Sequence, residues 1–199
     1  MNKAIRIIYD EHRSISAVLS GLKALAQMAR ESAVKPDFAV FRAMVYYIDA
    51  FPERMHHPKE DAHLFARLLA REPAARPLVD DLQAEHRKGA KLVRDLEQAL
   101  LSYEQIWPEG GLRFAEVVEA YAQFHWNHMR REELELMPMA QKSLTSDDWA
   151  AIEAAFLGND DPIADLREKD FTKLYQRIVS LAPAPVGLGE RWKAGTGVS

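Results

Sequence analysis

The sequence predicts an all-α protein: an antiparallel up-down-up-down four-helix bundle with two short C-terminal helices. Glycine and proline divide the 199 residues into long blocks with few internal breaks. Within these blocks apolar residues recur every three or four positions, which is the helical period, and the alternating β-branched runs typical of strands are absent. Four long amphipathic helices joined by short connections are typical of such a bundle.

The composition limits the classes of function. The chain is 48% hydrophobic and 28% charged, which is ordinary for a globular protein. A net charge of −4 argues against nucleic acid as a partner, because a nucleic-acid surface needs clustered positive charge. No apolar stretch of about 18 residues is present and the N-terminus has no signal-peptide core, so we expect a cytoplasmic protein without a membrane partner. Cysteine is absent, and any transition metal must therefore bind to histidine and carboxylate side chains.

The first two helices are predicted over residues 2–32 and 36–72. The first block contains no proline, and its apolar stripe has a histidine, His12, inside it. This stripe is formed by Ile5, Ile8, Ile15, Leu19 and Leu22. The second block lies between Pro36 and Pro73, and proline marks the ends of a helical pattern.

The third and fourth helices are predicted over residues 74–107 and 112–142. They are separated by the clearest break in the chain, Trp107-Pro108-Glu109-Gly110-Gly111. The apolar stripe of the third block contains a single histidine, His86. The stripe of the fourth block contains histidines and a glutamate in addition to apolar residues. Both stripes have the spacing of a helix with one buried face.

The chain after the bundle, which we assign to residues 1–142, is predicted to be a helical extension over residues 143–182. Helices are expected at 146–157 and 164–181, the first of them beginning at Thr145-Ser146-Asp147-Asp148. Its apolar face consists of Trp149, Ile152 and Phe156. We expect this face to pack on the bundle, because short helices need packing to persist, with a homodimer contact as the alternative.

Residues 183–199 are predicted to form a flexible tail. This segment is rich in proline and glycine, and such chain ends are usually poorly ordered unless they are tied down.

Two histidines lie four residues before a glutamate, in the pairs His56–Glu60 and His128–Glu132. Residues four apart lie about 6 Å apart along one face of a helix, so each pair can bind one metal centre from one helix. His12 and His86 are the single histidines of the other two helices. With about 1.5 Å of rise per residue and alternating helix directions, all six residues fall about 8–16 Å from the same end of the bundle.

A metal site explains this layer better than ordinary packing does. A lone histidine in an apolar stripe is usually a core residue, but two buried carboxylates without partners cost several kcal/mol each. Divalent or trivalent metal ions remove that cost. The sequence therefore predicts a metal centre ligated by His12, His56, Glu60, His86, His128 and Glu132.

The ordered set His12, His56-x3-Glu60, His86 and His128-x3-Glu132 resembles the hemerythrin-like, or HHE, cation-binding domain over roughly residues 3–142. The local strings Asp10-Glu11-His12, His56-His57-Pro58-Lys59-Glu60-Asp61, Glu85-His86 and His128-Met129-Arg130-Arg131-Glu132-Glu133 strengthen it. The resemblance implies two iron ions in a non-haem di-iron centre. It implies that Glu60 and Glu132 bridge the irons, with an oxo or hydroxo bridge from solvent. It places His12 and His56 on one iron, and His86 and His128 on the other.

The chain departs from the oxygen-carrying hemerythrins at one position. Those proteins have a fifth histidine one turn from the histidine of the third helix, where this chain has Leu82 and Ala90. Both irons are therefore expected to keep open or water-filled positions. Such positions suit exchange, oxidation chemistry or sensing better than reversible oxygen carriage.

Four other residues near the motifs are further candidates. His125 is either an additional ligand or a supporting core residue, and Tyr121 either donates to a bound oxygen species or packs in the core. His57 points aside on a regular helix, but Pro58 could distort the turn and bring it in as a ligand. His63 aligns with Glu60 and is expected to support the ligands from outside.

The sequence thus predicts a di-iron protein that handles or senses dioxygen, peroxide or nitric oxide, with a small diatomic or peroxide molecule as its partner. One alternative is an iron-storage, iron-sensing or metal-buffering module without turnover. Another is a structural site filled by zinc, which also accepts histidine and carboxylate ligands.

Overall fold

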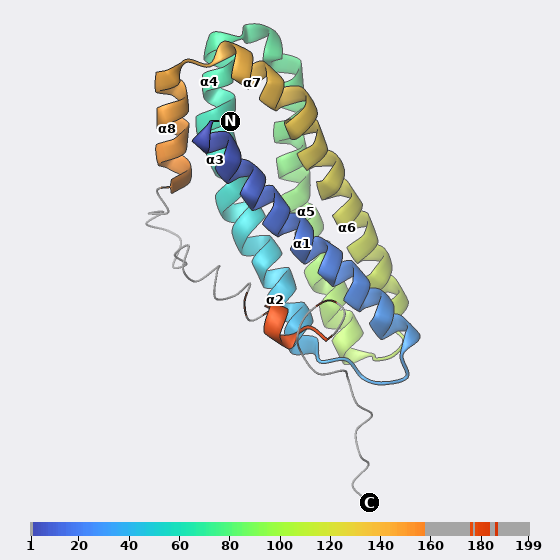
Figure 1. Cartoon of the computed structure of the whole chain (residues 1–199). Helices are drawn as coiled ribbons and strands as arrows, with labels where there is room; N and C mark the ends of the chain where they lie inside the picture. Colours follow the sequence, from blue (N-terminus) through green and yellow to red (C-terminus); the bar gives the residue numbers. More distant parts are fainter. Residues whose placement is uncertain (1, 158–175, 177, 184–185, 187–199) are drawn as a thin grey trace, which may run out of the picture.

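The computed structural model describes residues 2–157, 176, 178–183 and 186. Over residues 2–157 its helices form four long segments and one short one. The first segment is α1 (Lys3–Glu31), and the third is α5 (Arg76–Gln105), preceded by the 3₁₀ turn η3 (Pro73–Ala75). The short one is α8 (Ser146–Leu157). Figure 1 shows the four long segments lying side by side along their length.

The second and fourth segments change their helical winding along the way. The second consists of α2 (Phe38–Ile48), the π-helical η1 (Asp49–His56), α3 (His57–Lys59), the π-helical η2 (Glu60–Phe65) and α4 (Ala66–Arg71). The fourth consists of α6 (Gly111–Arg131), the π-helical η4 (Glu132–Leu136) and α7 (Met137–Ser143). The prediction of an all-α chain is confirmed, with no β-strand in residues 2–157, and each long segment begins and ends within two residues of its expected limits.

Side-chain caps begin the helices where the sequence has short polar residues. The backbone N–H of Ala39 donates to Asp37 Oδ1 (2.8 Å) at the start of α2. At the start of α8 the backbone N–H of Asp148 donates to Thr145 Oγ1 (3.2 Å), and the N–H of Thr145 donates back to Asp148 Oδ2 (3.0 Å). This reciprocal pair satisfies two backbone donors and confirms the predicted helix start.

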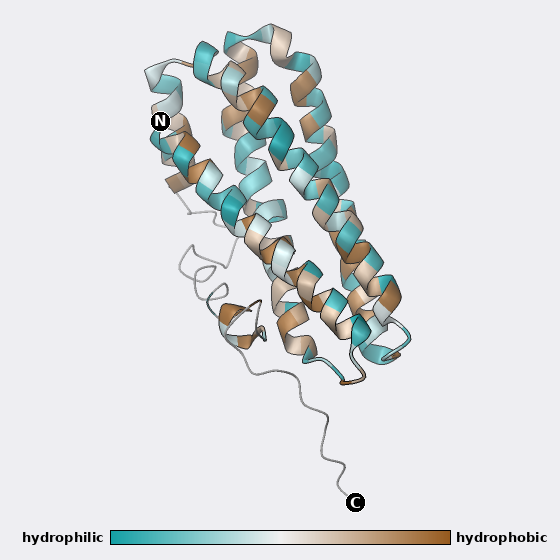
Figure 2. Ribbon diagram, turned by 45° about the vertical axis from the view of Figure 1, so that its right-hand side comes forward, coloured by the Kyte–Doolittle hydropathy of each residue, from teal (hydrophilic) through white to brown (hydrophobic). Residues whose placement is uncertain are grey.

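The apolar core consists of two clusters separated by a polar layer. Figure 2 shows hydrophilic and hydrophobic residues alternating along each helix, as expected for helices with one buried face. On α1 the first cluster ends at Ile8 and the second begins at Ile15, with His12 between them. On α5 they are separated in the same way around His86. The predicted metal residues therefore lie at one level of the core.

α8 packs along the side of the bundle, against α1 and η2. Trp149, Ile152 and Phe156 are buried in the same cluster as Ile5 and Leu64. The apolar face of this helix is thus covered within the chain. Of the expected helix 164–181, only residues 176 and 178–181 are described, and they are helical, while most of the expected tail lies outside the described residues. Among the helices described, none combines the length and the apolar character needed to span a membrane.

Candidate metal centre

Six buried residues from the four long segments meet in the layer between the apolar clusters. Each is at most 6% exposed. They are the six predicted ligands, here called the polar layer: His12, His56, Glu60, His86, His128 and Glu132. Buried polar and charged groups at one level need compensation. Either they neutralise one another's charge, or a shared ion does so.

π-helical turns carry both glutamates of the polar layer. Glu60 begins η2 and Glu132 begins η4. Prolines lie beside these turns: Pro58 two residues before η2, and Pro138 two residues after the end of η4. Proline has no N–H to donate to the carbonyl four residues back, and interruptions of this kind accompany changes of helical winding. Wider turns of this type are frequent at functional sites.

The polar layer forms two overlapping groups. His12 and His56 form one group with both glutamates, and His86 and His128 form the other with the same two glutamates. Within each group, one ligand atom from every residue lies within 4.8 Å of all the others. Each glutamate is therefore shared by two potential metal positions.

Each shared carboxylate directs one oxygen toward each histidine pair. Glu60 Oε1 lies 3.3 Å from His56 Nε2, and Glu60 Oε2 lies 3.6 Å from His86 Nε2. Glu132 Oε2 lies 3.4 Å from His12 Nε2, and Glu132 Oε1 lies 3.3 Å from His128 Nε2. All four oxygens are buried and have no hydrogen-bond partner in the described part of the chain. This is the arrangement that two bridged cations require.

The two histidines of each pair face each other through their Nε2 atoms. The Nε2–Nε2 distance is 3.1 Å for His12 and His56, and 3.0 Å for His86 and His128. A neutral imidazole has one N–H, and in all four rings a carboxylate engages Nδ1. The Nε2 lone pairs then point at each other and repel. A cation between them would accept both lone pairs and remove this repulsion. The residues present therefore fit a metal ion at each pair.

The carboxylates that engage Nδ1 form a closed ring around the layer. Each of these carboxylates is the sequence neighbour of a predicted ligand. Each contacts a histidine of the next long segment, and the carboxylate of the fourth segment contacts the histidine of the first. His12 donates to Glu133 (2.9 Å), His56 to Glu11 (2.7 Å), His86 to Asp61 (3.0 Å) and His128 to Glu85 (2.8 Å). Such partners orient metal ligands and fix their tautomer. Sequence reasoning did not identify these roles, although an acidic residue directly beside each ligand was the available signal.

The pKa values of the histidines show that the layer demands positive charge. Burial alone would lower the pKa of His86, but its contacts with Asp61, Glu132 and Glu60 outweigh burial and raise it to about 9. Burial would likewise lower the pKa of His128, yet Glu132 and Glu85 raise it to about 10. The carboxylates of the layer thus favour positive charge on these rings, and a bound cation would supply it in place of protons.

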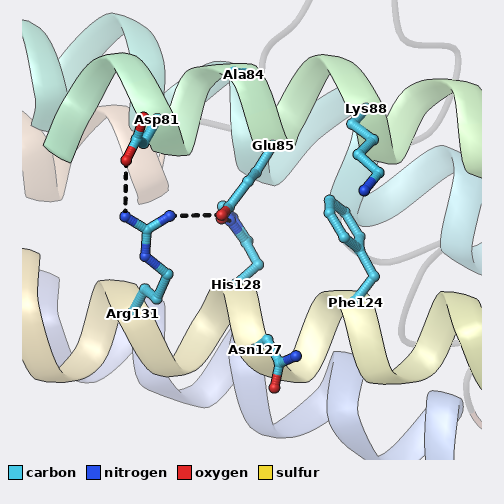
Figure 3. Close-up of a pocket in the computed structure, with 8 residues that line it drawn as sticks. All are labelled: Asp81, Ala84, Glu85, Lys88, Phe124, Asn127, His128 and Arg131. Atoms are coloured by element: carbon cyan, nitrogen blue, oxygen red, sulfur yellow. Dashed lines mark hydrogen bonds and ion pairs between the residues drawn. The ribbon is translucent and has the colours of Figure 1, made fainter. Parts of the chain in front are cut away.

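The groove shown in Figure 3 brings solvent close to one of the carboxylate–histidine couples. It lies between α5 and α6, has a volume of about 480 Å³, and includes Glu85 and His128 among its lining residues. Arg131 donates to Glu85 (2.6 Å) and to Asp81 (3.2 Å), as the dashed lines in Figure 3 indicate. Arg131 thus fixes the Glu85 carboxylate, which in turn accepts a hydrogen bond from His128 Nδ1.

α8 covers the layer near the other histidine pair. The ring of Phe156 meets His56 edge-on, with 6.1 Å between ring centroids, and the ammonium of Lys59 lies 5.7 Å from the Phe156 ring centroid. The two histidine pairs therefore have different surroundings.

A second buried polar cluster adjoins the polar layer. Its centre is Glu53, whose side chain is 3% exposed and which sequence reasoning did not identify. Tyr121 donates its hydroxyl to Glu53 Oε1 (2.9 Å), and His125 Nε2 lies 3.2 Å from the same oxygen. His57 is also buried and faces Glu53. The available signal was that Glu53 precedes His57 by four residues.

The additional sequence candidates thus lie in different places. Tyr121 and His125 face Glu53, and His125 is in none of the candidate ligand groups of the described residues, whereas His57 is in one of them. His63 is partly exposed, and Arg67 donates to its backbone carbonyl (3.1 Å).

Comparison with known proteins agrees with this geometry. No curated protein matches the sequence. Residues 3–140, more than half of the chain, match the hemerythrin HHE cation-binding domain. The polar layer lies entirely within this range, and the chain therefore belongs to the hemerythrin HHE cation-binding family.

Proposed function

We propose that the chain is an up-down-up-down four-helix bundle that binds two iron ions and uses them to handle or sense dioxygen, peroxide or nitric oxide. The observation that carries this proposal is the pair of overlapping ligand groups that share Glu60 and Glu132. Membership of a cation-binding family supports it. When bound, an iron pair supplies a change between ferrous and ferric states and a position for a small ligand.

The residues of the chain provide the setting for that chemistry. The four Nδ1–carboxylate couples fix the rings, so that each Nε2 presents its lone pair to the centre. The apolar clusters on both sides of the layer exclude water. Glu85, at the groove, offers a route for a proton between His128 and solvent.

Zinc accepts the same histidine and carboxylate donors and is the competing occupant. Two carboxylates shared between two positions, instead of four ligands closed around a single ion, favour iron. Two bridging carboxylates also suit octahedral coordination better than a closed tetrahedral site.

Metal analysis combined with optical spectra tests the proposal. Freshly purified protein is expected to contain two irons per chain, with ligand-to-iron charge-transfer bands that change on reduction and exposure to nitric oxide or oxygen. Bands that respond to none of these ligands would favour iron storage or buffering. A colourless protein that contains zinc and does not take up iron would contradict the proposal.

A further inference from the structure

α8 lies over the side of the polar layer that contains His56. Figure 1 shows this helix turning back from the end of α7 and running alongside the bundle, and it packs against α1 and η2. Phe156 is buried and meets the His56 ring edge-on, with 6.1 Å between ring centroids. The ammonium of Lys59, from α3, lies 5.7 Å from the centroid of the Phe156 ring. Phe156 therefore belongs to the wall that shields His56.

A short connection joins α8 to the bundle. α7 ends at Ser143 and α8 begins at Ser146, so that Leu144 and Thr145 form the whole connection, and the backbone of Leu144 is extended. Hinges in proteins are a few residues at the ends of elements that absorb large changes in backbone angles. A rotation at these two residues would turn α8 outward as a unit.

The contacts that hold α8 in place are limited. Its buried side chains are apolar: Trp149, Ile152 and Phe156. Two ion pairs add to them, Asp148 with Arg71 of α4 (2.8 Å) and Glu153 with Lys3 of α1 (2.5 Å). Both pairs lie near the surface, where ion pairs contribute little to stability. The attachment of α8 therefore depends mainly on one short apolar face.

Opening of α8 would require much less than unfolding of the bundle. A helix of 12 residues is marginal in water without packing, so a displaced α8 would also lose helical structure. Units with few buried apolar contacts open locally at a lower free energy than the whole domain. The His86–His128 pair has a different setting, because the groove between α5 and α6 brings solvent close to His128. Access to the two histidine pairs thus depends on different elements.

We infer that α8 is a hinged cover over the His12–His56 side of the polar layer, and that its outward movement at Leu144 and Thr145 admits metal ions and small solutes to that pair. The inference goes beyond the proposed function, because the movement belongs to the metal-free chain as well. The passage of metal ions is the part that rests on the proposed function. The His86–His128 pair does not depend on this movement.

A reversible cross-link between α1 and α8 tests the inference. The chain has no cysteine, so Lys3→Cys with Glu153→Cys introduces the only two thiols, and a bismaleimide with a reducible spacer joins them. Reaction of each histidine of the metal-free protein with diethyl pyrocarbonate, followed by mass spectrometry, measures access. His56 is expected to react about 10-fold or more slowly in the linked protein, because the link prevents local opening. Cleavage of the spacer should restore the original rate, and the rate of His128 should not change.

The matched control is a link that does not involve α8. Lys23 and Glu119 are the same residue types, form an ion pair of 2.8 Å, and join α1 to α6. The link made through Lys23→Cys and Glu119→Cys is expected to leave the rate of His56 unchanged. Equal rates for His56 before and after cleavage of the link to α8 would overturn the inference. Equal slowing by both links would overturn it too.

Hydrogen exchange of the unaltered protein keeps the inference testable if the cysteine variants do not fold. Backbone amides of α8 should exchange about 10-fold or more faster than those in the middle of α1. Exchange in α8 as slow as in α1 would contradict a cover that opens.

Release of iron to a chelator tests the passage of metal ions. The link to α8 should slow this release, and the link to α6 should not. Iron release at equal rates from the linked and the cleaved protein would remove α8 from the path of the ions. A chain that binds no iron would contradict the proposed function, while the histidine reaction and hydrogen exchange would still decide whether α8 opens.

Discussion

Each histidine of the polar layer has two nitrogens with separate tasks. Nδ1 faces a carboxylate and Nε2 faces the centre, so in the proposed site the carboxylate would orient the ring without touching the metal. The meeting of these six residues in one layer could be predicted, because i,i+4 pairs share a helix face and helix rise is constant. The pairing of each Nδ1 with its carboxylate could not be predicted, since the two residues lie on different helices and no sequence period connects them.

The Glu11–His56 couple gives a prediction for metal affinity. Glu11→Gln replaces the carboxylate that accepts from His56 Nδ1 with a neutral amide, and should weaken iron binding by about 10- to 100-fold. Competition with a calibrated chelator measures this. Asp10→Asn is the matched control, because Asp10 is exposed and pairs with Arg13 at the surface. Equal affinities for both variants and the unaltered protein would show that Glu11 does not support the ligand.

Removal of a ligand should lower both metal content and stability. His56→Ala and Glu60→Ala are expected to lose iron, and with it the stability that a metal bound only to the folded state provides. Iron analysis and thermal unfolding measure the two effects. His63→Ala, which alters a partly exposed histidine of the same segment, should change both much less. Full iron content in His56→Ala would remove this residue from the site.

The raised histidine pKa values predict how the metal-free protein responds to pH. The folded-state pKa values of His86, about 9, and His128, about 10, lie above the ordinary value of 6.5. Their contribution to stability is therefore fully present below pH 6.5 and is lost as the pH rises through 9 and 10. The midpoint of thermal unfolding of the metal-free protein should fall over this range. A midpoint that rises instead would contradict the charge balance inferred for the layer.

At the scale of the elements, glycine and proline determine most of what the sequence could predict. They end the helical pattern where the long segments end, so the limits were accurate to two residues. The π-helical turns were not predicted, because a single widened turn barely alters an apolar period of three or four. The available signals were the prolines beside the turns, Pro58 and Pro138, and only Pro58 led to an expected distortion, at His57.

The short helix α8 gives a prediction for packing. Phe156 is buried against His56, and Phe156→Ala should lower the free energy of unfolding by about 3–5 kcal/mol through loss of contacts and an unfilled cavity. Chemical denaturation of the metal-free protein measures it. Leu157→Ala is the matched control, because the Leu157 side chain is next in sequence and is 52% exposed. Similar losses in both variants would mean that α8 does not pack as described.

On the scale of the whole molecule, the polar layer connects two apolar clusters that share every long segment. This convergence could be predicted, because helix rise is constant and the connections are short. The buried cluster around Glu53 could not be predicted. It depends on a widened turn and on the absence of a side chain at Gly89, where a Cβ atom would lie 2.9 Å from Glu53 Oε1. Tertiary packing, rather than any local pattern, brings Tyr121 and His125 of α6 to Glu53.

The central claim is that two irons share Glu60 and Glu132, and the low-temperature EPR spectrum of the oxidised, iron-loaded protein tests it most directly. Two ferric ions bridged by common carboxylates and a solvent oxygen couple to an even-electron state. The protein is therefore expected to give no ferric signal at an iron content of two per chain. A high-spin ferric signal that accounts for all of the bound iron would show isolated ions and contradict the shared site.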